Sequence, residues 1–375
     1  MLRPIVSSAS WMPIARAQAQ QPVAPPEQPE IQDQAQLSQA SANPSFGDVA
    51  LSSALTALNL AGQTHLHAAI AVSQFLSRER PTQNPAILTM QPRLPPPALT
   101  GEQSALRDSP AVKLDRPMVL VPGYHTRVDQ LEPLVEKLTE GGQNGQACYF
   151  YNGSFYADRG CNELVEQPPA DTRVFISLPY SGRDNPDLVA DQLTDCLGRI
   201  RSATGTDKVD ALAYSMGGLS CQRYLDRGGE SLGKLLMVGT PNGGSGLAHL
   251  SLKALDAQSR GNDLKWLMAR SDVLEEDRQA LEWLAPKSPI RDDMQSRWPQ
   301  QRGLLEAAFI VGGASVPTFY WGAMPMTRGD GVVDTSSLAL GDTEVKLVSG
   351  PRHGALLYHP EVYSTMIDFF NWSRS

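Results

Sequence analysis

From about residue 115 onward, short apolar runs alternate with longer amphipathic stretches. The runs are rich in leucine and β-branched residues and mostly lack polar alternation, which is typical of strands buried on both faces of a sheet. Between them lie amphipathic helix candidates at about 129–140, 187–203, 216–227 and 360–372. This alternation predicts an α/β fold with a mostly parallel central sheet flanked by helices. The predicted strands are PMVLV (117–121), RVFISL (173–178), VDALA (209–213), KLLMVG (234–239), AAFIVGG (307–313) and EVKLV (344–348).

One connection, at about residues 245–305, is too long for a simple crossover and carries helical patterns of its own. We expect a helical cap, inserted after the strand KLLMVG, rather than a crossover between neighbouring strands. The apolar faces of its helices would either pack on the core or line a pocket. The large apolar residues on these faces are Leu264, Trp266, Leu267, Met268, Leu274, Leu281, Trp283, Leu284 and Trp298.

The N-terminal part of the chain differs in composition from the rest. Residues 1–45 are rich in Gln, Ala, Ser and Pro, with few large apolar side chains, so we expect a disordered leader. Residues 46–114 combine helical leucine spacing with a run of prolines, which predicts a helical N-terminal extension followed by a Pro-rich linker. Residues 115–375 then form the main α/β domain, including the cap.

The first twenty residues leave localisation open. Arg3 and the small residues Ala15 and Ala17 resemble a signal peptide with its cleavage site, but Pro4 and Pro13 interrupt the apolar region that export requires. Composition favours the disordered leader over the signal peptide. No apolar run in the sequence reaches the roughly 18 residues that span a bilayer, so we expect a soluble protein.

Charge and cysteine content narrow the classes of function. The chain has 375 residues, 41% of them hydrophobic and 19% charged, as an ordinary globular core requires. A net charge of -8 makes nucleic acid an unfavourable partner. None of the four cysteines stands in a CxxC pattern, so we expect no zinc site. Cys148 and Cys161 bracket an aromatic loop, and we expect them to form a disulfide if the protein is exported.

The segment VDALAYSMGGLSCQRYLDRGG (209–229) places Ser215 directly between a buried strand and a helix. Ala213 and Gly217 stand two positions before and after it, and a tight strand–serine–helix turn needs small residues there because the two backbones nearly touch. The turn exposes the hydroxyl at a helix N-terminus, where developing negative charge is favoured. Ser215 is therefore the candidate nucleophile, and the alternative is an ordinary helix-capping serine.

The segment MVLVPGYH (118–125) ends a buried strand in a loop where Gly123 allows close backbone approach. Attack by a serine on a carbonyl needs two N–H donors for the oxyanion. We assign one to Met216, immediately after the nucleophile, and the other to Tyr124 in this loop. His125 is a weaker candidate for the base, because it precedes the serine and lies on the oxyanion side.

Two C-terminal segments supply an acid and a base in the order Ser, Asp, His. In RGDGVVDTSSLAL (328–340), Asp330 precedes a glycine turn and is the candidate acid, while Asp334 is its rival and would otherwise cap the TSS segment. In VKLVSGPRHGALLYHP (345–360), His353 follows the last strand and is the candidate base. His359 is more consistent with a helix-start residue before Pro360.

Taken together, these motifs resemble the bacterial lipase group of the α/β-hydrolase superfamily over about residues 117–372. Four motifs occur in the order expected for that group. They are the strand–serine–helix elbow VDALAYSMGGL, the Gly-Thr-Pro turn in LLMVGTPNGGSGLA, the loop around Asp330 (the acid loop) and the loop around His353 (the base loop). Pro122 and Asp334 depart from residues common in that group. The resemblance implies an α/β-hydrolase fold and hydrolysis of carboxylic esters, often acylglycerols, through an acyl-enzyme.

The motifs and the resemblance together predict a lipase-like serine hydrolase with a Ser215–Asp330–His353 triad and no metal or organic cofactor. Its partner would be a small-molecule or lipid ester, with transient contact with a lipid interface and no obligatory protein partner. Two alternatives remain open: an acyltransferase that uses the same triad, and a non-catalytic α/β-hydrolase that serves as a binding protein.

Overall fold

The computed structural model describes residues 105–259, 273–319 and 326–374. All of them belong to one of the two units into which the chain divides, Asn59–Ser375. The predicted leader, most of the predicted extension, and the four cap residues Leu264, Trp266, Leu267 and Met268 lie outside the described residues. Within the described ranges, no helix is both long enough and apolar enough to span a membrane.

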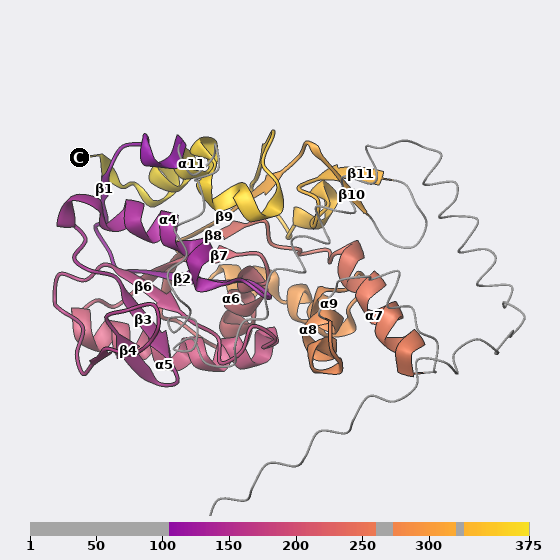
Figure 1. The fold of residues 1–375 in the computed structure, drawn as a ribbon, viewed down its shortest axis with the longest axis horizontal. Helices are drawn as coiled ribbons and strands as arrows, with labels where there is room; N and C mark the ends of the chain where they lie inside the picture. The colour runs from indigo at the N-terminus through magenta and orange to yellow at the C-terminus, as the bar shows by residue number, and fades with distance from the viewer. Residues whose placement is uncertain (1–104, 260–272, 320–325, 375) are drawn as a thin grey trace, which may run out of the picture. The chain divides into compact units, whose positions relative to one another are not determined.

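The described residues are organised around a nine-stranded sheet with strand order β12-β9-β8-β7-β2-β6-β3-β4-β5 (Figure 1). Neighbouring strands from β12 through to β3 pair in parallel, and β4 and β5 continue the sheet antiparallel. Every residue of the central strands β2, β6 and β7 is buried, which explains why their sequences are mostly apolar. The strands are β2 (Met118–Val121), β3 (Cys148–Tyr151), β4 (Ser154–Tyr156), β5 (Leu164–Val165), β6 (Val174–Ser177), β7 (Val209–Tyr214), β8 (Leu232–Val238), β9 (Ala307–Gly313) and β12 (Val345–Val348).

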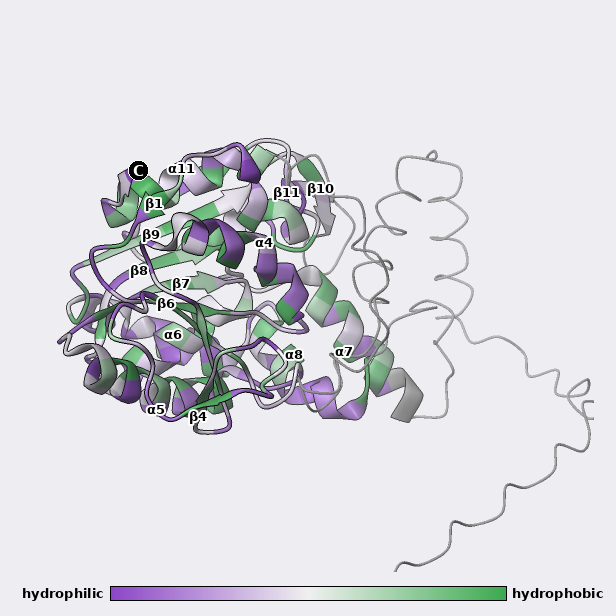
Figure 2. Ribbon diagram, turned by 60° about the vertical axis from the view of Figure 1, so that its left-hand side comes forward, coloured by the Kyte–Doolittle hydropathy of each residue, from purple (hydrophilic) through white to green (hydrophobic). Residues whose placement is uncertain are grey.

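Helices cover both faces of the sheet, so that the core has two apolar layers (Figure 2). On one face, α4 (Val128–Thr139) and α11 (Pro360–Phe370) bury residues such as Leu134 and Met366. On the other face, α5 (Pro186–Thr204) and α6 (Met216–Asp226) bury residues such as Leu193 and Cys221. The predicted α/β architecture, with a mostly parallel sheet between helices, is confirmed.

The core begins earlier than the predicted domain boundary at residue 115. Leu106, Val112 and Leu114 are buried in the same apolar layer as α11. The short strand β1 (Val112–Lys113) also pairs antiparallel with β13 (Ser373–Arg374), next to the end of the chain. The end of the predicted linker is therefore part of the folded core.

The aromatic segment 148–161, which the sequence analysis treats as a loop, instead adds two strands to the sheet. β3 and β4 form an antiparallel hairpin in which Tyr151 is paired with Ser154. Asn152 and Gly153 join them with φ values of 47° and 74°, the left-handed conformation that favours Asn-Gly in a two-residue hairpin turn. Aromatic residues on both sides of an Asn-Gly pair are a hairpin signal, and the loop prediction overlooked it.

The expected disulfide between Cys148 and Cys161 is wrong, since both are free thiols. Cys148 lies on β3 and packs into the apolar layer that contains α5 and α6. Cys161 packs against the opposite layer, which contains α4 and α11. Because the two side chains contact opposite faces of the sheet, their sulfur atoms cannot meet without rearrangement of the backbone.

The predicted cap, residues 245–305, contains short helices that Figure 1 shows grouped at one side of the sheet. Apolar residues of the cap pack on the first turn of α6 and form the group called here the cap cluster, with Tyr124, Leu252 and Val273 at its rim. The cluster consists of Met216, Leu219, Ala248, Leu255, Ala280, Leu281, Trp283, Leu284 and Met294. The helices are α7 (Gly246–Ser259), η3 (Glu275–Asp277), α8 (Arg278–Leu284), α9 (Pro289–Ser296) and α10 (Trp298–Arg302).

Not all of this segment lies in the cap cluster. Trp298 packs into the sheet core beside α6, and its indole N–H donates to Thr343 Oγ1 at 2.9 Å. The remaining elements are short. η2 (Glu140–Gly142) directly follows α4, and the C-terminal part of the chain contains the antiparallel hairpin β10 (Val316–Phe319) and β11 (Met326–Gly329), η4 (Thr335–Leu338) and η5 (His353–Tyr358).

Candidate active site

Ser215 occupies a sharp turn between β7 and α6, as the sequence pattern predicts. Its backbone has φ 54° and ψ -126°, a strained conformation for a residue other than glycine. The backbone N–H of Ser215 donates to Val238 O of the neighbouring strand β8 at 2.8 Å, which anchors the turn to the sheet. Because α6 begins at Met216, the serine hydroxyl stands at the positive end of that helix.

Small residues around the serine are required by close backbone contacts. A Cβ on Gly217 would lie 2.2 Å from Val121 O, and a Cβ on Gly218 would lie 2.1 Å from Thr240 Oγ1. Neither contact is compatible with a larger side chain. The glycines therefore allow α6 to start directly against β2 and the turn after β8.

His353 connects Ser215 to a buried carboxylate. His353 Nε2 lies 2.9 Å from Ser215 Oγ, and His353 Nδ1 lies 2.7 Å from Asp330 Oδ2. His353 and Asp330 are 2% and 1% exposed, so the pair is shielded from water. The other carboxylate oxygen of Asp330 accepts the backbone N–H groups of Val332 and Val333, at 2.9 and 2.7 Å. The structure thus brings the three predicted triad residues into one hydrogen-bonded chain.

The base loop is held in place by contacts with the strands beneath it. The Tyr214 hydroxyl donates to the backbone carbonyl of His353 at 2.9 Å. Burial and the nearby Asp330 carboxylate raise the pKa of Tyr214 well above its ordinary value, so this hydroxyl stays a neutral donor. Gly239, in the turn after β8, lies under the imidazole, since a Cβ there would be 3.0 Å from His353 Cε1.

The rival residues of the sequence analysis have other contacts. Asp334 caps η4, accepting the backbone N–H of Ser336 at 2.8 Å. His359 is the N-cap residue of α11. His125 Nε2 lies 3.1 Å from Asp277 Oδ1 of the cap.

The loop after β2 passes close to the nucleophile, as the oxyanion-hole prediction requires. A Cβ on Gly123 would lie 2.6 Å from Ser215 Cβ. The Gly123 N–H donates to Thr126 Oγ1 at 3.1 Å, and the His125 N–H donates to a carbonyl of the β6–α5 loop at 2.9 Å. Between them, the Tyr124 N–H has no acceptor among the described residues. The N–H of Met216 belongs to the first residue of α6, a position without an acceptor inside the helix.

The sequence analysis did not predict the contact that Asp277 and Arg183 make beside the loop after β2. Asp277 is fully buried in the cap and contacts both His125 and Arg183 of the sheet domain. These partners are 152 and 94 residues away along the chain. The sequence feature related to this contact is His125, next to the predicted oxyanion residue, which the sequence analysis considered only as a candidate base.

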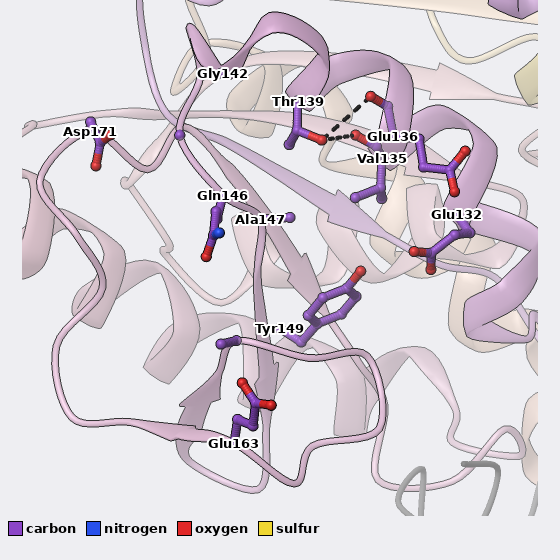
Figure 3. Close-up of a pocket in the computed structure, with 12 residues that line it drawn as sticks. Glu132, Val135, Glu136, Thr139, Gly142, Gln146, Ala147, Tyr149, Glu163 and Asp171 are labelled. Carbon is purple, nitrogen blue, oxygen red and sulfur yellow. Dashed lines mark hydrogen bonds between the residues drawn. The ribbon is translucent and has the colours of Figure 1, made fainter.

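A separate pocket of about 620 Å³ lies between α4 and the β3–β5 part of the sheet (Figure 3). None of the triad or oxyanion residues lines it. Its charged lining residues are all carboxylates, namely Glu132, Glu136, Glu163 and Asp171. This pocket is therefore not the site where an ester would meet Ser215.

Comparison with known proteins gives similarity at the level of structure alone. No protein-family model matches the chain, and no curated protein matches it. A Bacillus licheniformis lipase in its mature form is 16% identical, with a TM-score of 0.47, covering 68% of this chain and 91% of that one. A Legionella pneumophila phospholipase is 14% identical, with a TM-score of 0.47, covering 69% and 60%. An α/β-hydrolase-fold protein from Chitinophaga pinensis is 16% identical, with a TM-score of 0.36, covering 70% and 90%.

Such low values carry no activity over to this chain, and the fold assignment rests on its own topology. Parallel strands in the order β12-β9-β8-β7-β2-β6-β3, helices on both faces and a strained serine between β7 and α6 define the α/β-hydrolase fold. The predicted fold class is confirmed.

Proposed function

We propose that this chain is a serine hydrolase that cleaves carboxylic esters, with Ser215 as nucleophile, His353 as general base and Asp330 as the orienting acid. The observation that carries the proposal is the continuous hydrogen-bonded chain from Ser215 Oγ through the imidazole to the buried carboxylate. A serine hydroxyl is a weak nucleophile by itself, and an adjacent imidazole held in one orientation activates it.

The proposed reaction proceeds through an acyl-enzyme. Ser215 Oγ attacks the ester carbonyl carbon while His353 Nε2 accepts the hydroxyl proton, and the N–H groups of Tyr124 and Met216 stabilise the oxyanion. The imidazolium then protonates the leaving alcohol as the ester C–O bond breaks. Water, deprotonated by His353, releases the acid and restores the serine.

We further propose that the acyl group of the substrate is apolar, as in lipid or acylglycerol esters. Support comes from the cap cluster, in which Met216 is a member and Tyr124 packs at the rim. Both oxyanion donors therefore adjoin apolar side chains of the cap. Burial of acyl methylenes against such a surface favours binding by about 0.8 kcal/mol for each CH₂.

A series of p-nitrophenyl esters of increasing acyl length, from acetate upward, tests this function. We expect hydrolysis by the wild type, kcat/KM that rises with acyl length until the apolar surface is filled, and no turnover by Ser215→Ala. Adding an alcohol acceptor measures the share of acyl transfer, and a product that is mostly the new ester would favour an acyltransferase instead. Absence of turnover for every ester would contradict the proposal.

A further inference from the structure

Asp277, a carboxylate of the cap, is buried against the loop that carries the proposed oxyanion donor Tyr124. It is 0% exposed and receives hydrogen bonds from three separate segments. His125 Nε2, in the loop after β2, donates to Oδ1 at 3.1 Å. Arg183 Nη1, in the β6–α5 loop, and the backbone N–H of Leu274 both donate to Oδ2, the latter at 2.6 Å. The cap is thereby joined to two loops of the sheet domain through one side chain.

His125 transmits this contact to the oxyanion loop. Its backbone has φ 53°, a left-handed conformation that residues with a Cβ rarely adopt. Its ring stacks on the Tyr124 ring with centroids 4.0 Å apart and an interplanar angle of 18°. Its N–H donates to Gly182 O at 2.9 Å. The Tyr124 N–H belongs to the Gly123–Tyr124 peptide, directly before His125. Because the His125 N–H is bonded to Gly182 O and its ring stacks on Tyr124, fixing His125 limits the movement of Tyr124.

The electrostatics of the contact favour a charged Asp277. Burial alone would raise its pKa, but hydrogen bonds from His125 and from the Leu274 N–H outweigh burial and hold the pKa below its ordinary value. Burial and the Asp277 charge together raise the pKa of Tyr124 well above the ordinary range of tyrosine. Glu276 also lies near this contact, with its Oε2 4.0 Å from Arg183 Nε.

We propose that Asp277 is a positioning residue, which holds the Tyr124 N–H in the oxyanion hole by fixing His125 from the cap side. This inference rests on the proposed function. It links the cap to the oxyanion loop, because the same carboxylate belongs to the cap and contacts that loop. Loss of this contact should therefore affect the transition state more than binding of the ground-state ester.

The test compares Asp277→Asn and Asp277→Ala with Gln279→Ala in the full chain. Gln279 lies two residues further along the cap and makes a separate contact with the sheet domain, accepting from Asn185 Nδ2 at 2.8 Å. For both Asp277 variants we expect kcat to fall roughly 10- to 100-fold while KM changes by less than about threefold. Gln279→Ala should keep the wild-type kcat, although it too loses a hydrogen bond between cap and sheet domain.

A second readout is affinity for an alkyl trifluoromethyl ketone. In this adduct Ser215 Oγ adds to the carbonyl carbon, the hydroxyl proton passes to His353, and the ketone oxygen becomes an oxyanion. The Asp277 variants should lose affinity by about the factor by which kcat/KM falls, whereas a purely structural role would not link the two losses.

His125→Asn provides an independent variant if the Asp277 variants do not fold. Asparagine tolerates the left-handed backbone but is too short to reach Asp277, so the same loss of kcat is expected. Wild-type kcat in folded Asp277→Asn or in His125→Asn would overturn the inference. A wild type with no ester turnover and no fluorophosphonate labelling would instead remove the proposed function.

Discussion

Asp330 and His353 are joined by two hydrogen bonds, one between side chains and one between backbones. Nδ1 of the imidazole lies 2.7 Å from the carboxylate Oδ2, and the His353 N–H donates to the Asp330 backbone carbonyl at 2.8 Å. A Cβ on Gly313, at the end of β9, would lie 2.7 Å from Asp330 Cβ, so the acid loop packs directly on the sheet. The acid loop and the base loop therefore form one unit, which aims the imidazole at Ser215.

Asp330→Asn should be far more damaging to activity than Asp334→Asn. An asparagine at 330 would no longer fix the tautomer of the imidazole, and we expect kcat to fall by about 10³- to 10⁴-fold. Asp334 caps η4, and asparagine is an equally good cap, so that variant should keep activity and stability close to wild type. Steady-state kinetics on both purified variants check this, and a larger loss in Asp334→Asn would exchange the two roles.

Gly123→Ala should remove most of the activity, because its Cβ would lie 2.6 Å from the Cβ of Ser215. The loop must then move, and the Tyr124 N–H moves with it. The matched control is Gly198→Ala, at an exposed helical position where a Cβ meets nothing within 4 Å. The control should be active and more stable by about 1 kcal/mol. Kinetics together with thermal unfolding separate the two effects, and full activity in Gly123→Ala would argue against the assigned oxyanion loop.

Leu252→Gln should reduce turnover of long acyl esters more than turnover of acetate. Leu252 packs at the rim of the cap cluster, which contains the proposed oxyanion residue Met216, whereas Leu250 on the same helix is 42% exposed and serves as the control. We expect the ratio of long-chain to acetate kcat/KM to fall several-fold in Leu252→Gln and to stay unchanged in Leu250→Gln. An equal loss for both esters, with unchanged stability, would mean that this surface does not select the substrate.

Asp226→Asn should destabilise the fold at neutral pH but not in acid. The hydrogen bond from Arg297, at 2.7 Å, outweighs burial and lowers the pKa of Asp226, and Arg223 adds to this at 2.7 Å. Because the folded-state pKa is depressed, the stabilisation is complete above the ordinary value near 3.9 and disappears as pH falls through the folded value. Urea unfolding should give a difference of about 2 kcal/mol at neutral pH that shrinks as the pH falls below about 3.9. A difference that does not vary with pH would show that the carboxylate charge is not the cause.

Much of the sheet could be predicted from the sequence because its central strands are buried on both faces. Strands β2, β6, β7, β8, β9 and β12 correspond to the six predicted apolar runs. The strand–Ser215–helix turn was predictable for a similar reason, since the small residues around it reflect local steric contacts. Features of this kind can be predicted because they depend on residues that are neighbours in the sequence.

The remaining features depend on which distant segments meet. Asp277 reaches His125 across 152 residues, and no spacing along the chain indicates that pairing. The Cys148–Cys161 expectation was wrong because spacing alone does not tell on which face of the sheet each sulfur lies. The β3–β4 hairpin could have been predicted from the sequence, since Asn152 and Gly153 lie between aromatic residues.

The most direct test of the account is to label the wild-type chain with a fluorophosphonate and locate the modified residue by peptide mass spectrometry. The account predicts one label for each chain, on Ser215, because its hydroxyl lies 2.9 Å from the imidazole Nε2 of His353, whose other nitrogen faces Asp330. Labelling should disappear in Ser215→Ala, while the circular dichroism spectrum and the unfolding temperature stay close to wild type. A label on another serine, or equal labelling of Ser215→Ala, would contradict the central claim.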